Sequence, residues 1–355
     1  MKHIVLAPLA GVSDIPFRRI CSEHGATLTY VEMLSATAIT YNNKKTFEMM
    51  ARHSSEKILG VQVTGPTVDQ VERAVRILDA EGFETVDINM GCPVRKVVAS
   101  GSGSGFLTDP KRISDTLAAA RSATAKPLSV KYRLGWTREN VTVEDTSLRA
   151  VLANVDMCTI HGRTRSEGYN VPVDIAGISR GVSVIKSRNP KIIALGNGNI
   201  FSRGAAHKML AQTRCDGVMV SRGALGNPWV FEDIAGKRAQ SPSLVEWMET
   251  VFRHIDFQEE HYGDTFLAAR LMRKHLLWYA TGFPSTRALR SELNTVESLL
   301  AARKLISNWA ANLPKDLIRI CEGAEHSFLE NADPKFEMDR ELDRGVGHLD
   351  LPIDS

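Results

Sequence analysis

The sequence predicts an α/β fold: a (β/α)8 TIM barrel followed by an all-helical bundle domain. Short apolar runs rich in β-branched residues occur eight times before Pro242. Segments with helical periodicity lie between several of these runs, and after Pro242 only helical patterns remain. Strands that alternate with helices are typical of a parallel sheet covered by helices. Eight such units within about 235 residues indicate a closed barrel.

The eight strand-like runs are apolar along most of their length, as expected for strands buried on both faces. They read HIVLAPL, LTYVEML, ILGVQVT, TVDINMG, PLSVKYR, VDMCTIHG, KIIALGNG and GVMVSRG. Helices are predicted within 13–25, 67–82, 109–124 and 202–215, because apolar residues recur there three and four apart and the segments often end near glycine. The unit at 169–191 has the least regular pattern.

Helical patterns without strands cover 243–263, 265–282 and 295–313. We therefore expect a catalytic barrel at 1–240 and a helical bundle at 243–320. The remaining segment, 321–355, contains ten acidic and three basic residues and is predicted to be a largely unstructured acidic tail. The chain carries a formal charge of +3, so residues 1–320 carry +10. This basic body suggests a polyanionic partner or serves only solubility.

Several classes of protein are disfavoured by composition. No run approaches the 18 or more apolar residues of a membrane span, and Pro8 interrupts the first apolar run too early for a secretory signal. We expect a cytoplasmic protein. The cysteines are odd in number, widely spaced and free of metal-ligand patterns, so we expect neither a disulfide framework nor a metal site. They are Cys21, Cys92, Cys158, Cys215 and Cys321.

Polar residues and glycines occur where the predicted strands end, at the face where such barrels place their active sites. The loops after the last two strands, GNGN and SRGALGNP, contain glycines that let backbone N–H groups approach a ligand, and these loops commonly hold phosphate. Taken singly, Gln62 also fits a strand cap, Lys131 an exposed lysine and His161 a structural histidine. Their joint placement at one face favours a site for a phosphorylated ligand.

The ordered motifs resemble those of the tRNA-dihydrouridine synthases, flavoenzymes that reduce specific uridines in tRNA. The resemblance covers about residues 3–320, and its most specific element is DINMGCPVRKVVASGSGSGFL at 87–107. The supporting motifs are APLAGVSDIPFR, VQVTG, VKYRLGW, TIHGRTR, GVMVSRGALGNPWVF and, in the helical region, ARLMRKHLLWYATGFP.

The resemblance implies an FMN cofactor, NADPH as reductant and tRNA as substrate, with Asn89 and Arg163 as contacts to the uridine. A cation at Lys131 would favour the anionic reduced flavin. Part of the tRNA contact is expected from Arg270, Arg273, Lys274 and Arg290, which equally fit a solvated helix face. We expect a monomer. The implied cofactor-binding residues are Pro8, Leu9, Ala10, Gln62, Lys131, His161, Asn197, Gly198, Asn199, Ser221 and Arg222.

Cys92 is the implied catalytic residue. Reduction of the uracil C5=C6 bond needs a hydride at one carbon and a proton at the other, and a thiol that is mostly protonated at neutral pH suits proton donation to C5. The alternative role is a small buried hydrophobe. Two other functions fit parts of the pattern: an FMN barrel acting on free pyrimidines, like dihydroorotate dehydrogenases, and a tRNA-binding protein without catalysis.

Overall fold

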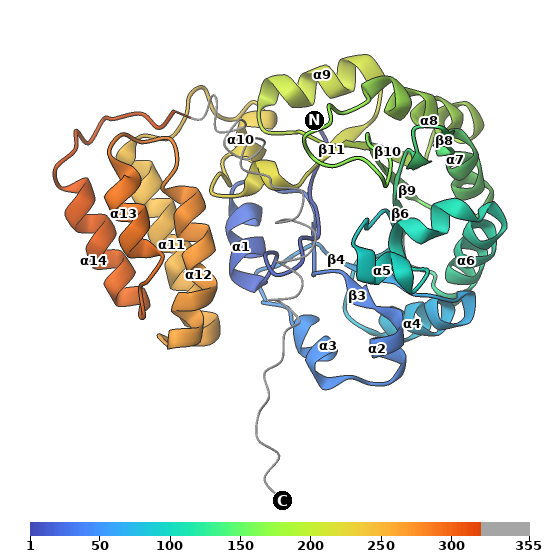
Figure 1. The fold of residues 1–355 in the computed structure, drawn as a ribbon, viewed down its shortest axis with the longest axis horizontal. Coiled ribbons are helices and arrows are strands. Elements are labelled where there is room, and N and C mark those ends of the chain that lie inside the picture. The colour runs from blue at the N-terminus through green and yellow to red at the C-terminus, as the bar shows by residue number, and fades with distance from the viewer. Residues whose placement is uncertain (321–355) are drawn as a thin grey trace, which may run out of the picture.

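The computed structural model describes residues 1–320 and confirms the predicted barrel and the helical region that follows it (Figure 1). Eight parallel strands form the barrel wall, in the order β1-β11-β10-β9-β6-β5-β4-β2. The wall closes between its first and last strands, where Leu6 N donates to Leu28 O at 2.9 Å. The barrel strands are β1 His3–Leu6, β2 Thr29–Tyr30, β4 Leu59–Thr64, β5 Thr85–Met90, β6 Leu128–Arg133, β9 Met157–His161, β10 Ile193–Asn197 and β11 Gly217–Val220.

Helices cover the outside of the barrel (Figure 1). Those that follow the strands and pack on the wall are α1 Ile15–Glu23, α4 Val68–Ala80, α6 Pro110–Ala123, α7 Val143–Leu152, α8 Ile175–Arg188, α9 Arg203–Thr213 and α10 Val230–Ile234. The four helices predicted from periodicity are confirmed as α1, α4, α6 and α9. Helix α8 lies in the least regular unit because its sequence IAGISRGVSVI combines glycines with β-branched residues of low helix propensity. Tertiary packing and the Asp174 N-cap, which accepts from Gly177 N at 2.8 Å, stabilise it instead.

Several short elements that periodicity did not predict follow the barrel strands. They are β3 Leu34–Ser35, α2 Ala36–Thr40 and α3 Lys44–Met49 after β2, α5 Arg95–Ala99 and the 3-10 helix η1 Gly103–Thr108 after β5, the hairpin β7 Gly135–Thr137 and β8 Asn140–Val141 after β6, and the 3-10 turn η2 Arg222–Ala224 after β11. Each is too short for a periodic signal. They build up the rim at the carboxyl ends of the strands.

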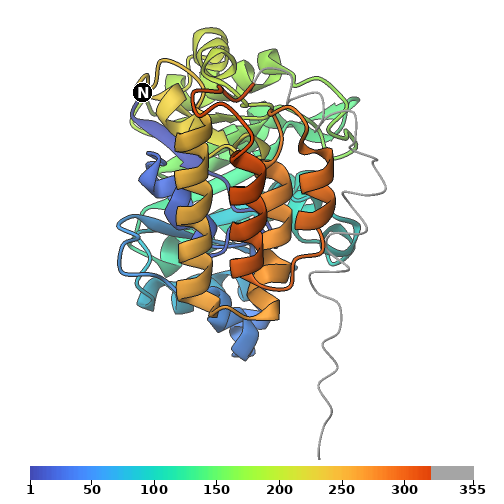
Figure 2. The same cartoon turned by 90° about the vertical axis from the view of Figure 1, so that its left-hand side faces the viewer.

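The helical region forms a bundle beside the barrel, and Figure 2 shows its helices packed side by side. The helices are α11 Leu244–Tyr262, α12 Phe266–Tyr279, α13 Thr286–Leu293 and α14 Leu299–Ala310. A separate hydrophobic cluster, which includes Trp247, Met272 and Ile306, holds them together. Helix α11 begins with a capping box between Ser243 and Glu246. Within residues 1–320, no helix is both long and apolar enough to cross a membrane.

Helix α1 joins the two parts, because it packs on α11 while it covers the barrel. Arg19 pairs with Glu260 at 2.7 Å, and Arg253 pairs with Glu23 at 2.8 Å. At the same junction, the buried Phe17 ring lies 5.0 Å from the His275 ring. The junction thus combines buried ring contacts with ion pairs.

Two histidines of this junction are buried, His254 on α11 and His275 on α12, with ring centroids 4.9 Å apart. Burial lowers the pKa of His254 to about 3, and burial lowers the pKa of His275 well below its ordinary value. Neither ring nitrogen of His275 has a hydrogen-bond partner within residues 1–320. Both histidines are therefore neutral in the folded protein.

We predict that acid destabilises the protein through this pair. Below pH about 6.5 the unfolded chain binds protons that the folded chain excludes, so the free energy of unfolding falls by up to about 1.4 kcal/mol per pH unit for each histidine. Urea unfolding measured between pH 7.5 and 5 should show this slope, and His275→Phe should reduce it. His207→Gln, at an exposed position on α9, is the control. An equal slope in wild type and His275→Phe would contradict the prediction.

Candidate functional site

A cavity of about 350 Å³ lies at the carboxyl ends of the barrel strands. All fourteen residues that the sequence analysis singled out for catalysis, cofactor or substrate line this cavity. They come from every barrel strand end except that of β2, which contributes Met33 from the segment behind it. The lining residues predicted from sequence are Pro8, Leu9, Ala10, Gln62, Asn89, Cys92, Lys131, His161, Arg163, Asn197, Gly198, Asn199, Ser221 and Arg222.

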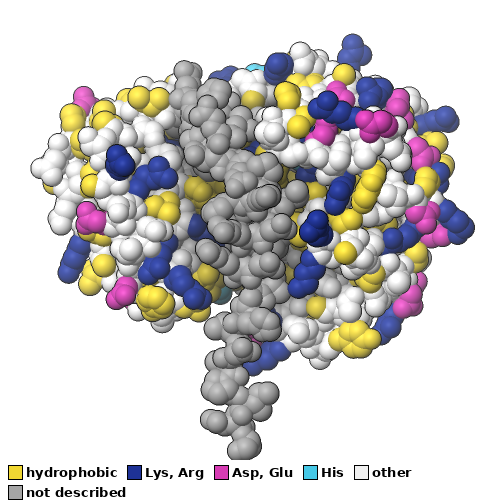
Figure 3. Space-filling model, in the orientation of Figure 1, with side chains coloured by type: hydrophobic (Ala, Val, Ile, Leu, Met, Phe, Trp, Pro, Cys, Tyr) yellow, Lys and Arg dark blue, Asp and Glu magenta, His cyan; other side chains and the backbone are white. Residues whose placement is uncertain are grey.

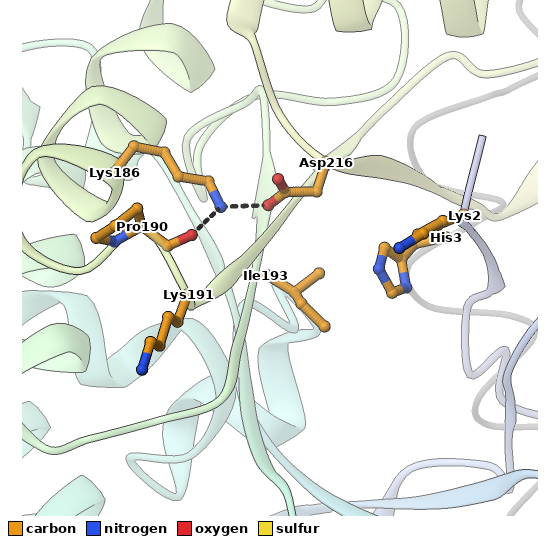
Figure 4. A pocket seen from close by; sticks show the side chains of 7 residues that line it. All are labelled: Lys2, His3, Lys186, Pro190, Lys191, Ile193 and Asp216. Atoms are coloured by element: carbon orange, nitrogen blue, oxygen red, sulfur yellow. Dashed lines mark hydrogen bonds and ion pairs between the residues drawn. The ribbon is translucent and has the colours of Figure 1, made fainter.

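A second hollow, of about 330 Å³, lies at the opposite end of the barrel, where His3 begins β1 and Asp216 precedes β11 (Figure 4). The Lys186 ammonium there already pairs with Asp216 at 2.5 Å and donates to the Pro190 carbonyl at 3.2 Å. Lys186 therefore has partners within the protein and is not free to bind a ligand. The cavity at the carboxyl ends is the better candidate for a functional site.

The Cys92 backbone is held from two sides directly after β5. On one side the N–H groups of Gly91 and Cys92 donate to Asn89 Oδ1 at 3.0 and 2.8 Å. On the other, the N–H and the hydroxyl of Ser104 both donate to Cys92 O at 2.9 Å. Gly103 lies between them with φ +57°, and a Cβ there would approach Cys92 O to 2.7 Å. The glycine-rich segment thus folds beneath Cys92, where only glycine fits.

The Cys92 thiol is half-buried and lines the cavity, whereas Cys21, Cys158 and Cys215 are buried. Burial raises the pKa of the Cys92 thiol, and the nearby charges of Arg133 and Lys131 offset only part of that effect. The thiol is consequently protonated at neutral pH. It can donate a proton to a molecule in the cavity.

Gln62 and Asn89 lie side by side in the cavity wall, because Asn89 Nδ2 donates to Gln62 Oε1 at 2.8 Å. Beneath them lies Asp87, which is 0% exposed and accepts from Gln62 Nε2 at 2.8 Å. Burial raises the pKa of Asp87 to about 6 despite its hydrogen bonds. Asp87 belongs to the quoted motif, yet sequence reasoning gave it no role because nothing in a single strand shows what pairs with it.

Lys131 brings a cation into the cavity from β6. Its ammonium makes no hydrogen bond or ion pair with any residue of the described chain. Burial and the neighbouring charge of Arg133 together lower the pKa of Lys131 to about 8, and the nearby Asp87 carboxylate offsets only part of their effect. An enclosed cation without a partner indicates an anionic or carbonyl-bearing ligand.

Arg133 and Arg163 hold the loop after β9. Arg133 Nη1 donates to Thr164 O at 2.8 Å, and Arg163 Nε donates to Val171 O at 2.7 Å. Arg163 Nη2 also donates to Tyr169 O and to Asn199 Oδ1, at 3.0 and 3.1 Å. The Arg163 side chain is fully buried, so these donors serve the loop, and its contact with substrate stays a prediction.

His161 and Arg222 line the cavity together with Lys131, Arg133 and Arg163. Burial, together with the surrounding lysine and arginine charges, lowers the pKa of His161 well below its ordinary value, so the ring is neutral. The Arg222 guanidinium lies 3.8 Å from the centre of the Tyr169 ring and 3.4 Å from Asn199 Oδ1. Asn197 Nδ2 donates to Met219 O at 2.7 Å and thereby ties the ends of β10 and β11 together.

Trp278 is a further lining residue, and it comes from α12 of the bundle. The helical region therefore forms part of the cavity wall. Sequence reasoning missed this contact because strand-end logic covers only barrel residues. The sole signal was the motif ARLMRKHLLWYATGFP, which attaches the helical region to the same family pattern.

The basic residues proposed for the bundle surface differ in their surroundings. Arg273 donates to the Val296 carbonyl at 2.7 and 2.9 Å, and Lys274 donates to the Gly11 carbonyl at the barrel junction. Arg270 and Arg290 are exposed and pair with no residue in the described part of the chain. Two of the four therefore have structural contacts, and two are available to a partner.

Comparison with known proteins identifies the family of the chain. The family model for dihydrouridine synthase matches residues 5–313. The tRNA-dihydrouridine synthase B of Pasteurella multocida is 35% identical, over 83% of this chain and 89% of that protein. The synthase B of Pseudomonas putida is 31% identical, over 84% of this chain and 89% of that protein. The tRNA-dihydrouridine(47) synthase [NAD(P)(+)] of Cryptococcus neoformans is 34% identical over 76% of this chain and 39% of that protein. The chain belongs to the dihydrouridine synthase family.

Proposed function

We propose that this protein is an FMN-dependent oxidoreductase that reduces specific uridines of tRNA to 5,6-dihydrouridine, with NADPH as reductant. The observation that carries the proposal is the presence of a protonated thiol, Cys92, and of a cation, Lys131, that has no hydrogen-bond or ion-pair partner among residues 1–320, on the walls of one cavity. The family match and the names of the relatives support the same reaction. Their names also support tRNA as the substrate.

The residues present fit FMN by their chemistry. Arg222, with the loops after β10 and β11, offers a guanidinium and backbone amides to a phosphate. Gly198 there lines the cavity and has φ +121°, a conformation that favours glycine. Lys131 offers its charge to a ring that becomes anionic on reduction. The residues that would hold FMN are Pro8, Leu9, Ala10, Gln62, Lys131, His161, Asn197, Gly198, Asn199, Ser221 and Arg222.

When bound, FMN would supply the hydride for uracil C6 after its own reduction by NADPH. Cys92 would donate the thiol proton to C5, which the raised pKa of the thiol supports. Asn89 holds the Cys92 backbone and lines the cavity, which supports the expected contact with the uracil. Arg163 would act on the substrate through the loop that it anchors.

A uridine within folded tRNA must leave its stack to reach this cavity, at a cost of a few kcal/mol that contacts with the tRNA must offset. Lys and Arg side chains are spread over the visible faces of both the barrel and the bundle (Figure 3). On the bundle, Arg270 and Arg290 are the exposed, unpaired candidates for phosphate contacts among the four that the sequence suggested. An enzyme acting on free pyrimidines would not need them.

Cys92→Ala should keep FMN and tRNA bound but slow dihydrouridine formation by about 100-fold or more, the usual contribution of a positioned proton donor. Single-turnover assays with mass spectrometry of the tRNA measure this. Cys92→Ser replaces the thiol by a hydroxyl of similar shape, which is a much weaker acid. Dihydrouridine formation should therefore also be slow in this variant. Undiminished turnover in either variant, or turnover of free uridine at the rate of tRNA, would count against the proposal.

FMN affinity should fall as the pH rises above about 8, because Lys131 then loses its charge in the ligand-free protein. The dissociation constant should rise by up to about tenfold per pH unit, the limit for one proton. Fluorescence titration at several pH values measures it. Lys131→Met should bind FMN weakly without this pH dependence, and Lys96→Met, at an exposed position on α5, should keep the wild-type profile. A flat profile in wild type would contradict the prediction.

Affinity for tRNA should weaken with added salt, since each phosphate contact releases counterions. The double variant Arg270→Gln/Arg290→Gln should bind tRNA less tightly. The slope of log K against log salt concentration should become less steep by about one to two. Arg76→Gln on α4, across the barrel from the bundle (Figure 1), is the control. Filter binding over a range of salt concentrations tests this, and an unchanged slope in the double variant would place the contacts elsewhere.

A further inference from the structure

We propose that Asp87 is a positioning residue that sets the amide orientation of Gln62 and, through Gln62, of Asn89. By doing so it determines which groups the cavity wall presents to a ligand and how the Cys92 backbone is held. The part that concerns FMN rests on the proposed function. The part that concerns Cys92 does not.

We call the chain of hydrogen bonds from Asp87 through Gln62 to Asn89 the relay. The register of the barrel places Asp87 in one row with Gln62 and with a second partner, Ser129. Gln62 on β4 is opposite Asp87 on β5, and Asp87 is opposite Ser129 on β6. Side chains of paired residues point to the same face of a sheet, so all three meet on the buried inner side. Asp87 Oδ1 accepts from Ser129 Oγ at 2.5 Å, and Asp87 Oδ2 accepts from Gln62 Nε2 at 2.8 Å.

An ionised carboxylate only accepts hydrogen bonds, so the end of the Gln62 amide that faces Asp87 must be its NH2 group. The Gln62 carbonyl oxygen then faces Asn89 and accepts from Asn89 Nδ2 at 2.8 Å. This leaves Asn89 Oδ1 to accept from the N–H groups of Gly91 and Cys92. Because Asp87 only accepts, it fixes the orientation of the Gln62 amide, which in turn fixes that of Asn89. Asn89 then presents its oxygen to the backbone N–H of Cys92.

The same orientation determines the chemistry of the cavity wall. Gln62 and Asn89 each use one hydrogen of an NH2 group within the relay, which leaves one hydrogen on each nitrogen. Both residues line the cavity. The wall therefore offers donors, which suit a planar ring edge that bears carbonyl oxygens. The pyrimidine edge of a flavin has this chemistry. A reversed Gln62 amide would instead offer an acceptor and repel such an edge.

Three variants test the relay. Asp87→Leu has a similar shape but no acceptor, so the Gln62 amide loses its orientation. Ser129→Ala removes the other hydrogen bond of the same carboxylate and leaves the relay intact. The double variant Asp87→Asn/Gln62→Glu keeps one negative charge: the new amide donates to the new carboxylate, which still accepts from Asn89. That variant preserves the Cys92 backbone contacts but replaces the donor in the wall by an acceptor.

The first measurement is the rate of Cys92 alkylation by iodoacetamide in FMN-free protein, with the modified peptide identified by mass spectrometry. Cys92 is the cysteine of residues 1–320 that is not fully buried, so the reaction reports on its position. We expect the rate to rise about threefold or more in Asp87→Leu, because a loosened backbone exposes the thiol. Ser129→Ala and the double variant should stay within about twofold of wild type.

The second measurement is FMN affinity. It should fall about tenfold or more in both Asp87→Leu and the double variant, and stay near wild type in Ser129→Ala. Wild-type alkylation and FMN affinity in Asp87→Leu would overturn the proposal, as would equal effects of Asp87→Leu and Ser129→Ala. Failure of the wild-type protein to bind FMN would sink the proposed cofactor, whereas the alkylation rates would still decide the role of Asp87.

Discussion

Closure of the eight-stranded wall between β1 and β2 is the constraint on which the site depends. Parallel strands in a closed barrel bring all their carboxyl ends to one rim, so residues from 7 to 225 meet around one cavity. The register then decides which side chains are neighbours, as where Asn89 on β5 lies opposite Lys131 on β6. Helix α12 adds Trp278 to that rim, so the bundle completes the wall.

The cavity concentrates positive charge, and the fold accommodates it by giving most of these cations carbonyl partners. Arg133 and Arg163 donate to backbone oxygens of the loop after β9, and Arg222 lies against the Tyr169 ring. Burial disfavours the protonated forms of His161 and Lys131, and the like charges nearby add to this effect, so His161 is neutral and the pKa of Lys131 falls to about 8. Within residues 1–320 no carbonyl accepts from the Lys131 ammonium, so its charge is available to a ligand in the cavity.

Sequence reasoning predicted the barrel, its eight strands and the lining residues, because strand-end position is a local property that a single run of residues reveals. It did not predict α8, where packing overrides low helix propensity, or the contribution of Trp278, which depends on the bundle docking through α1. It also did not predict that Arg163 donates hydrogen bonds to the carbonyls of Tyr169 and Val171. Nor did it predict the hydrogen bond between Asp87 and Gln62. Such hydrogen bonds join segments whose registers no single strand specifies. The expected acidic tail at 321–355 lies outside the described residues.

The protonated state of Cys92 has a consequence for the durability of the protein. Thiolates, not thiols, react with peroxides and disulfides, so the burial that raises the pKa of Cys92 also slows its oxidation to sulfenic acid. Among the cysteines of residues 1–320, Cys92 is the one that is not fully buried, so it would otherwise be the cysteine most open to oxidation. The same burial that keeps Cys92 protonated thus gives the thiol resistance to oxidants.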